Sequence, residues 1–199
     1  VCRMGKELRR GEEQLAEEVL GNLGIPIVGR IESPGLLEGG DCLWVDERTL
    51  VIGRGYRTND EGIRQMASIL EPQGVTVVPV GLPHWHGPAE CLHLLSLISM
   101  LDEDLAVVYL PLLEAAFVEF LRHRNINLVC IPDQEFPTQG CNVLVTAPRK
   151  CIVLKENQVT IELLEAAGCT VTTYVGDEIS HNRAGGPTCL TRPLWRVRP

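Results

Sequence analysis

The sequence predicts an α/β fold built from a repeat in the order strand, strand, helix, strand. Short runs of β-type residues alternate with amphipathic helical stretches along most of the 199 residues. Four residues begin successive repeats, at intervals of 52, 49 and 47 residues: Asp41, His93, Asn142 and Cys189. A period of about 50 residues is typical of repeat architectures. We expect one domain over residues 1–199, with whole repeats near residues 41–80, 92–132 and 142–176 and a partial repeat at each end.

The first whole repeat starts with two short apolar strands that a polar turn connects. Thr58 and Glu61 have the spacing of a capping box, so a helix is expected to begin beside them. A third run, rich in valine, follows that helix and completes the repeat. The expected elements are strands at 42–45 and 49–52, a helix at 59–70 and a strand at 75–79.

The second and third repeats show the same order of patterns. Pro111 stands where a helix can begin, and the apolar residues after it recur with helical spacing. Gly168 follows the helix of the third repeat in the position of a C′ residue. The second repeat is expected to have strands at 93–100 and 105–109, a helix from Pro111 and a strand at 126–131. The third is expected to have strands at 142–146 and 151–154, a helix at 158–167 and a strand at 170–175.

The ends of the chain show parts of the same repeat. A helix at 7–22 and a strand at 25–31 are expected before the first whole repeat, and one strand after Cys189. Because the first residue is Val, we expect the chain to be a fragment, processed, or incomplete at its start. Repeats arranged around an axis would bring residues about 50 positions apart to a common centre. The alternative is an ordinary α/β sheet in which these residues are scattered.

The composition narrows the classes of partner. A net charge of −8 argues against binding along a nucleic-acid backbone, which needs clustered lysine and arginine. It agrees with a small cationic substrate, and equally with a role in solubility. No apolar run approaches the roughly 20 residues of a membrane span, and no secretory signal is visible. The eight cysteines form no Cys-x-x-Cys pair, so we expect reduced thiols in a cytoplasmic protein that binds neither nucleic acid nor membrane.

Residues able to perform covalent catalysis stand near the starts of repeats. Cys189 follows the pair Gly185-Gly186 and offers a thiol, His93 offers an imidazole, and Glu38 and Asp41 offer carboxylates. A nucleophile, a base and an acid that orients the base make a plausible catalytic set. Each residue also has a structural interpretation: a core histidine, a buried cysteine, and carboxylates that cap the Gly39-Gly40 turn.

These motifs resemble a known group of enzymes. The residues that carry the resemblance are Leu37-Glu38-Gly39-Gly40-Asp41, Arg57-Thr58-Asn59, His93-Leu94 with Ser96, and Cys189. The ordered set, which covers nearly the whole chain, resembles the guanidine-modifying superfamily of arginine deiminases, amidinotransferases and dimethylarginine dimethylaminohydrolases. The resemblance implies a pentein α/β propeller, a ring of five such units, N-terminally incomplete here. Leu95, where arginine deiminases usually carry aspartate, and the Gly-Gly-Pro-Thr-Cys run favour the dimethylargininase-like branch.

The resemblance also implies roles for individual residues. Cys189 would attack the guanidinium carbon, His93 would transfer protons, and Glu38 would hold the substrate cation or orient His93. The products would be citrulline and an amine, with no metal or organic cofactor. Asp41 would support this arrangement in the substrate site, and Arg57 and Arg10 would bind the substrate's α-carboxylate. An arginine deiminase or amidinotransferase activity of the same superfamily is the alternative.

The sequence also agrees with two other classes of function. Zinc binding is one, because His84, His86, Cys91 and His93 stand within ten residues, although in no common zinc-finger spacing. A non-catalytic binding module is the other, since three whole repeats and two partial ones do not complete a five-unit ring. An incomplete ring would expose a sheet edge, which favours association into a homo-oligomer.

Overall fold

The structure, a computed structural model, describes residues 1–90, 92–182 and 185–194. The chain divides into two compact parts, which we call the N-terminal body (Val1–Leu95) and the C-terminal body (Ser96–Pro199). The described residues form three separate three-stranded sheets, one in the first body and two in the second. Among those residues, every helix is too short or too polar to cross a membrane.

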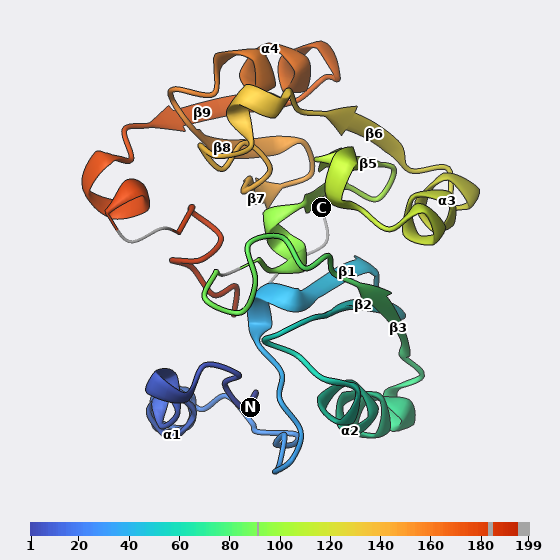
Figure 1. The fold of residues 1–199 in the computed structure, drawn as a ribbon, viewed down its shortest axis with the longest axis vertical. Helices are drawn as coiled ribbons and strands as arrows, with labels where there is room; N and C mark the ends of the chain where they lie inside the picture. The colour runs from blue at the N-terminus through green and yellow to red at the C-terminus, as the bar shows by residue number, and fades with distance from the viewer. Residues whose placement is uncertain (91, 183–184, 195–199) are drawn as a thin grey trace. The chain divides into compact units, whose positions relative to one another are not determined.

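The N-terminal body contains one complete repeat. Its elements are β1 (Cys42–Asp46), β2 (Thr49–Arg54), α2 (Asp60–Leu70) and β3 (Thr76–Gly81). Strand β2 lies in the middle of the sheet, antiparallel to β1 and parallel to β3. A parallel pair needs a crossover connection, and α2 supplies it while lying along the sheet (Figure 1). The predicted order strand, strand, helix, strand is therefore confirmed.

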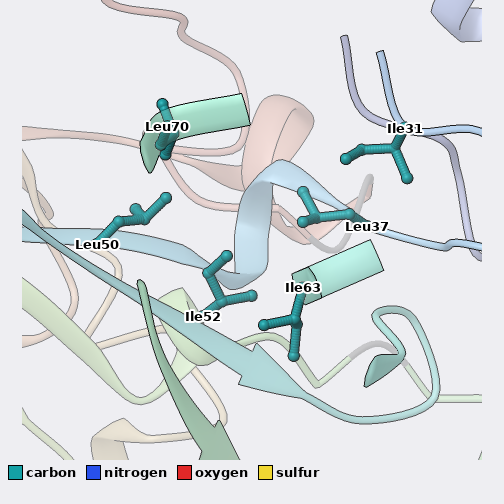
Figure 2. Packing of buried hydrophobic residues seen from close by; sticks show 6 residues of the cluster. All are labelled: Ile31, Leu37, Leu50, Ile52, Ile63 and Leu70. Carbon is teal, nitrogen blue, oxygen red and sulfur yellow. The ribbon is translucent and has the colours of Figure 1, made fainter. Parts of the chain in front are cut away.

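The core of this repeat lies between α2, β2 and the segment before β1. Five consecutive residues of β2, Thr49 to Gly53, are buried, as expected for a central strand covered on both faces. Figure 2 shows the side chains that meet there: Ile31, Leu37, Leu50, Ile52, Ile63 and Leu70. Leu37 immediately precedes Glu38, so this apolar cluster holds the backbone from which a candidate catalytic carboxylate projects.

The start of α2 differs from the predicted capping box. Asn59, not Thr58, is the N-cap residue, and its Oδ1 accepts the Gly62 N–H at 2.9 Å. Thr58 is fully buried, and its hydroxyl donates instead to a carboxylate oxygen of Asp41 at 2.6 Å. The Thr58 oxygen, which would accept a helix N–H in a capping box, accepts the Glu38 N–H at 3.1 Å, so a tertiary contact overrides the local motif. The capping-box prediction was wrong by one residue.

The segment before β1 is less regular than predicted. The helix expected at 7–22 is a short 3₁₀ helix (Glu7–Arg9) and then α1 (Glu12–Asn22), separated by Gly11 at φ +107°. No strand forms between residues 25 and 31, which corrects the second expectation. The Val1 amino group donates to the Gly29 carbonyl at 2.6 Å, and the Ile31 N–H donates to the Val1 carbonyl at 3.0 Å. Two such bonds have the alternation of a parallel pair but are too few to make a strand.

The C-terminal body contains two further repeats with the same pairing. The elements of the second repeat are β4 (Ile98–Asp102), β5 (Leu105–Val108), α3 (Ala115–His123) and β6 (Asn127–Cys130). Those of the third are β7 (Leu144–Ala147), β8 (Lys150–Leu154), α4 (Gln158–Ala166) and β9 (Thr170–Tyr174). In both, the middle strand pairs antiparallel with the strand before it and parallel with the strand after the helix. Helix α3 begins later than predicted, because Pro111 lies in a 3₁₀ helix (Leu110–Leu112).

The hairpins give the true correspondence between repeats. Each first strand has one irregularity, at Asp46, Asp102 and Ala147 respectively. Counting back five residues places Leu97 and Asn142, not His93, at the position of Asp41. The predicted equivalence of His93 was wrong because the connection from β3 to β4 is longer than that from β6 to β7. The strand expected at 93–100 accordingly begins at Ile98.

The helices end alike. After each of the four α-helical segments of the described residues, one residue takes a left-handed conformation: Gly24, Gly74, Asn125 and Gly168. After α4, the Gly168 N–H donates to the Glu165 carbonyl and the Cys169 N–H to the Leu164 carbonyl, both at 2.9 Å. This pair of bonds is a Schellman motif, and it confirms Gly168 as the C′ residue.

Candidate active site

A buried carboxylate is the centre of the candidate site in the N-terminal body. Glu38 is 1% exposed, and N–H groups converge on its two oxygens. Oε1 accepts the backbone N–H of Gly5 at 3.0 Å and that of Lys6 at 3.2 Å. Arg57 donates from Nη1 to Oε1 at 3.0 Å, and His93 Nε2 lies 2.9 Å from Oε2. A buried charge is tolerated when it is paired and hydrogen-bonded in this way.

The surroundings of Glu38 favour its charged form. Burial alone would raise the pKa of this carboxyl. The hydrogen bond and charge of His93, together with Arg57 and the Lys6 amide, outweigh burial and lower the pKa of Glu38 to about 2. Glu38 is therefore ionised at neutral pH and can only accept hydrogen bonds. His93 must then carry its proton on Nε2 in this contact.

Asp41 holds the backbone beside His93. It is fully buried, and its Oδ1 accepts the N–H of Leu94, the next residue after His93, at 3.0 Å. Its Oδ2 accepts the Thr58 hydroxyl at 2.6 Å. Burial raises the pKa of Asp41, and the charge of His93 and these hydrogen bonds oppose the rise without cancelling it. Both oxygens of Asp41 thus accept hydrogen bonds from the protein, and the bond to Leu94 fixes the backbone next to His93.

Gly40 of the predicted motif has a steric explanation. A Cβ placed on Gly40 would lie 2.6 Å from Nδ1 and 2.7 Å from Cγ of His93. Real Cβ atoms do not approach other atoms so closely, so the imidazole can rest against this backbone because residue 40 is glycine. Close approach, rather than a special backbone angle, accounts for Gly40.

The two arginines proposed from the sequence occupy different surroundings. Arg57 is 7% exposed and its guanidinium is engaged with Glu38. Arg10 lies at the surface, where it pairs with Glu7 at 3.4 Å. Its neighbour Arg9 comes within 3.9 Å of Glu38 Oε2 and also pairs with Glu12. The sequence did not single out Arg9 because Arg9 ends a short 3₁₀ helix and Arg10 is extended, so no helical period shows which arginine faces Glu38.

Cys189 belongs to the C-terminal body, where it and Cys130 are the exposed cysteines of the described residues. It is exposed, in a turn in which its N–H donates to the Gly186 carbonyl at 3.1 Å. Cys141, Cys151 and Cys169 are buried, and burial raises the pKa of each thiol, to about 12 for Cys151. Every cysteine that the structure describes is a free thiol. Cys189 therefore has the exposure that a nucleophile needs, which it shares with Cys130 but not with the three buried thiols.

The alternative of a metal site has little support within the described residues. No group of three or more histidine, cysteine or acidic side chains there could hold a metal ion. The Nδ1 of His84 lies 2.6 Å from the Tyr56 hydroxyl, and His93 contacts Glu38. Cys91, the thiol of that predicted cluster, lies outside the described residues.

Comparison with known proteins now identifies the family. The arginine deiminase family model matches residues 3–124 and 110–196. The chain belongs to the arginine deiminase family. This places it in the guanidine-modifying superfamily that its motifs resemble.

Members of this family with two different names are similar to the chain. It is 27% identical over 239 aligned positions to the arginine deiminase of Listeria welshimeri, covering 98% of this chain and 58% of that protein. It is 30% identical over 170 positions to the dimethylarginine dimethylaminohydrolase of Streptomyces coelicolor, covering 84% and 58%. The chain thus spans a little over half the length of these relatives.

A solved structure gives the same picture. The dimethylarginine dimethylaminohydrolase of Pseudomonas aeruginosa, as a cysteine-to-serine variant complexed with citrulline, superposes with a TM-score of 0.71 at 29% identity. The match covers 88% of this chain and 63% of that one. This arginine deiminase family member therefore shares its fold with a known guanidine-modifying enzyme over most of its length.

Proposed function

We propose that the protein is a hydrolase that cleaves a C–N bond of the guanidinium group of arginine or a methylated arginine. The observation that carries the proposal is the buried, ionised Glu38 hydrogen-bonded to His93. A buried carboxylate fixes the orientation of an imidazole and stabilises the positive charge it gains with a proton. The Glu38–His93 pair is therefore suited to transfer protons, and the exposed Cys189 supplies a nucleophile.

The proposed reaction proceeds through a covalent intermediate. A guanidinium carbon is a poor electrophile because its positive charge is shared by three nitrogens. The Cys189 thiolate forms a C–S bond to that carbon, and the C–N bond to the leaving amine breaks as His93 gives the amine a proton. The resulting S-alkylthiouronium is attacked by water, from which His93 takes a proton. The C–S bond then breaks, releasing citrulline and regenerating the thiolate.

Four other residues complete the proposed site. Glu38 orients His93, and Asp41 fixes the chain beside it. Arg57 and Arg10 bind the substrate's α-carboxylate. Arg57 engages Glu38 through one guanidinium nitrogen, and a guanidinium has five N–H donors in all. The proposed mechanism uses no cofactor.

The proposal extends to the whole protein. We infer that the repeats are arranged around an axis within one pentein domain, and that copies of the chain can associate. The free thiols support a cytoplasmic location. Arginine deiminase is a second candidate activity, because the family model and the Listeria relative carry that name. The two activities release different amines, ammonia from arginine and dimethylamine from dimethylarginine.

The test offers arginine, dimethylarginine and a small panel of other guanidino compounds to the purified protein and measures citrulline and the released amine. We expect the Cys189→Ser variant to form no citrulline and the wild type to carry a sulfur adduct detectable by intact mass. The matched control is Cys130→Ser, which changes another exposed cysteine of the same body and should leave activity unchanged. Near-normal citrulline formation by Cys189→Ser would refute the mechanism.

A further inference from the structure

Asn142 makes contacts around Cys189 that the family resemblance did not single out. Its side chain is largely buried, 7% exposed, just before β7. Oδ1 accepts the Thr188 backbone N–H at 3.0 Å and the Thr188 hydroxyl at 2.7 Å. Nδ2 lies 3.3 Å from the Sγ atom of Cys189. One amide therefore holds both the residue before the cysteine and the sulfur itself.

The orientation of this amide follows from its partners. Thr188 offers two donors to the same atom, so that atom must be the carbonyl oxygen of Asn142. The opposite end of the amide is then the NH₂ group, which can only donate. The contact with Cys189 is therefore an N–H donated to sulfur, an interaction that is stronger when the sulfur is a thiolate.

Gly186 allows this arrangement to form. A Cβ on residue 186 would lie 2.4 Å from both Cγ and Oδ1 of Asn142. The backbone before the cysteine thus rests directly on the amide, and the Gly186 carbonyl accepts the Cys189 N–H. Gly186 is therefore a point of close contact in the structure.

We propose that Asn142 is a positioning residue for Cys189, which fixes the cysteine turn through Thr188 and stabilises the sulfur anion through its NH₂ group. The inference rests on the proposed function, in which Cys189 is the nucleophile. Without the amide, the thiolate would lose one hydrogen-bond donor, and the cysteine turn would lose the acceptor that holds Thr188. A lost hydrogen bond to a charged group is worth about 1.5–3 kcal/mol, a factor of about 10 to 100 in reactivity.

Two substitutions separate the two parts of this role. Asn142→Asp keeps an oxygen acceptor for Thr188, so the turn can form, but it removes the donor to sulfur and adds a negative charge beside it. Asn142→Ala removes both contacts. Asn182→Asp, at an exposed position of the same body, is the control for the chemical change itself.

The readout is the rate at which iodoacetamide alkylates each cysteine, followed by peptide mass spectrometry across a pH series. Cys130, also exposed, serves as an internal reference in every sample. We expect Asn142→Asp to slow alkylation of Cys189 by about 10-fold or more at neutral pH, with Cys130 unchanged and the circular dichroism spectrum retained. Asn182→Asp should behave as the wild type.

Equal rates for Cys189 in the wild type and Asn142→Asp would overturn the proposal. Equal slowing of Cys189 and Cys130 would also overturn it, since that reports a general change in the fold. Alkylation needs no substrate, so it is independent of the proposed reaction. Slowed alkylation of Cys189 in Asn142→Asp, combined with normal citrulline formation by Cys189→Ser, would support the contact and reject the proposed mechanism.

Discussion

Replacing Glu38 with glutamine should change how the stability of the protein depends on pH. The pKa of Glu38 is lowered from 4.5 to about 2 in the folded protein. Between these values the unfolded chain binds a proton that the folded chain does not, so the free energy of unfolding falls as the pH falls. The stabilisation is fully present above about pH 4.5 and amounts to about 3 kcal/mol, from about 1.4 kcal/mol per unit of pKa.

The glutamine variant removes this dependence and leaves Arg57 without its anionic partner. Near pH 7 we expect the Glu38→Gln variant to be less stable by about 3–5 kcal/mol, the usual cost of breaking a buried pair. The difference from the wild type should shrink by about 2 kcal/mol as the pH is lowered from 6 to 3. Urea denaturation followed by circular dichroism at each pH measures both quantities.

Glu61 provides a matched control for this experiment. Its pKa is also lowered to about 2, but by Arg64 and Gln65 at the surface. Salt at about 1 M, where the Debye length is about 3 Å, should abolish the pH-dependent effect of Glu61→Gln and leave that of Glu38→Gln. A wild-type and Glu38→Gln difference that stays constant from pH 6 to 3 would refute the view that a buried, ionised Glu38 anchors the site.

Two further substitutions test the local geometry. Gly40→Ala should push the His93 ring from its place and lower citrulline formation about 100-fold, the usual effect of a shift of about 1 Å, with an unchanged circular dichroism spectrum; activity close to the wild type would contradict the steric argument. Asn59→Ala removes the N-cap of α2 and should lower the free energy of unfolding by about 1–2 kcal/mol in urea, whereas the same change at the exposed Asn182 should cost little.

Much of the fold could be predicted because the spacing of apolar residues along the chain reveals its strands and helices. The buried run of β2 and the apolar faces of the helices give signals that depend on neighbouring residues alone. The errors fall where a distant residue decides the outcome. Thr58 stands where a helix cap is expected, but its side-chain oxygen accepts the N–H of Glu38. The segment at 25–31 has the residues of a strand, but the backbone of Gly29 and Ile31 is hydrogen-bonded to the single residue Val1.

The candidate site divides in the same way. The resemblance implies that Glu38 holds the substrate cation or orients His93, and in the structure the two residues are hydrogen-bonded although 55 residues apart. Arg9 and Arg10 lie at the end of a short 3₁₀ helix, where no helical period shows which of the two faces Glu38. Asn142 was noted as the start of a repeat, but an amide has no signature that distinguishes a structural role from a contact with sulfur.

In two repeats, the residue just before the first strand is hydrogen-bonded to the segment that leads into the next repeat. Asp41 accepts the N–H of Leu94, and Asn142 accepts that of Thr188. In the second repeat, where Leu97 fills the equivalent position, the hydroxyl of Ser99 donates to the Cys141 carbonyl at 2.7 Å instead.

The hydrogen bonds made by Asp41 and Asn142 each hold a residue that neighbours a candidate catalytic group. Leu94 follows His93, and Thr188 precedes Cys189. Each hydrogen bond fixes the backbone of the residue next to the candidate group. The same bonds that join the repeats therefore help to position the imidazole and the thiol. A catalytic group needs rigid support of this kind. Asn142 makes one contact more, because its amide also donates to the Cys189 sulfur. The oxygens of Asp41, by contrast, accept from Leu94 and Thr58. The same position in two repeats thus serves the fold in both, and in one it also contacts the sulfur of Cys189.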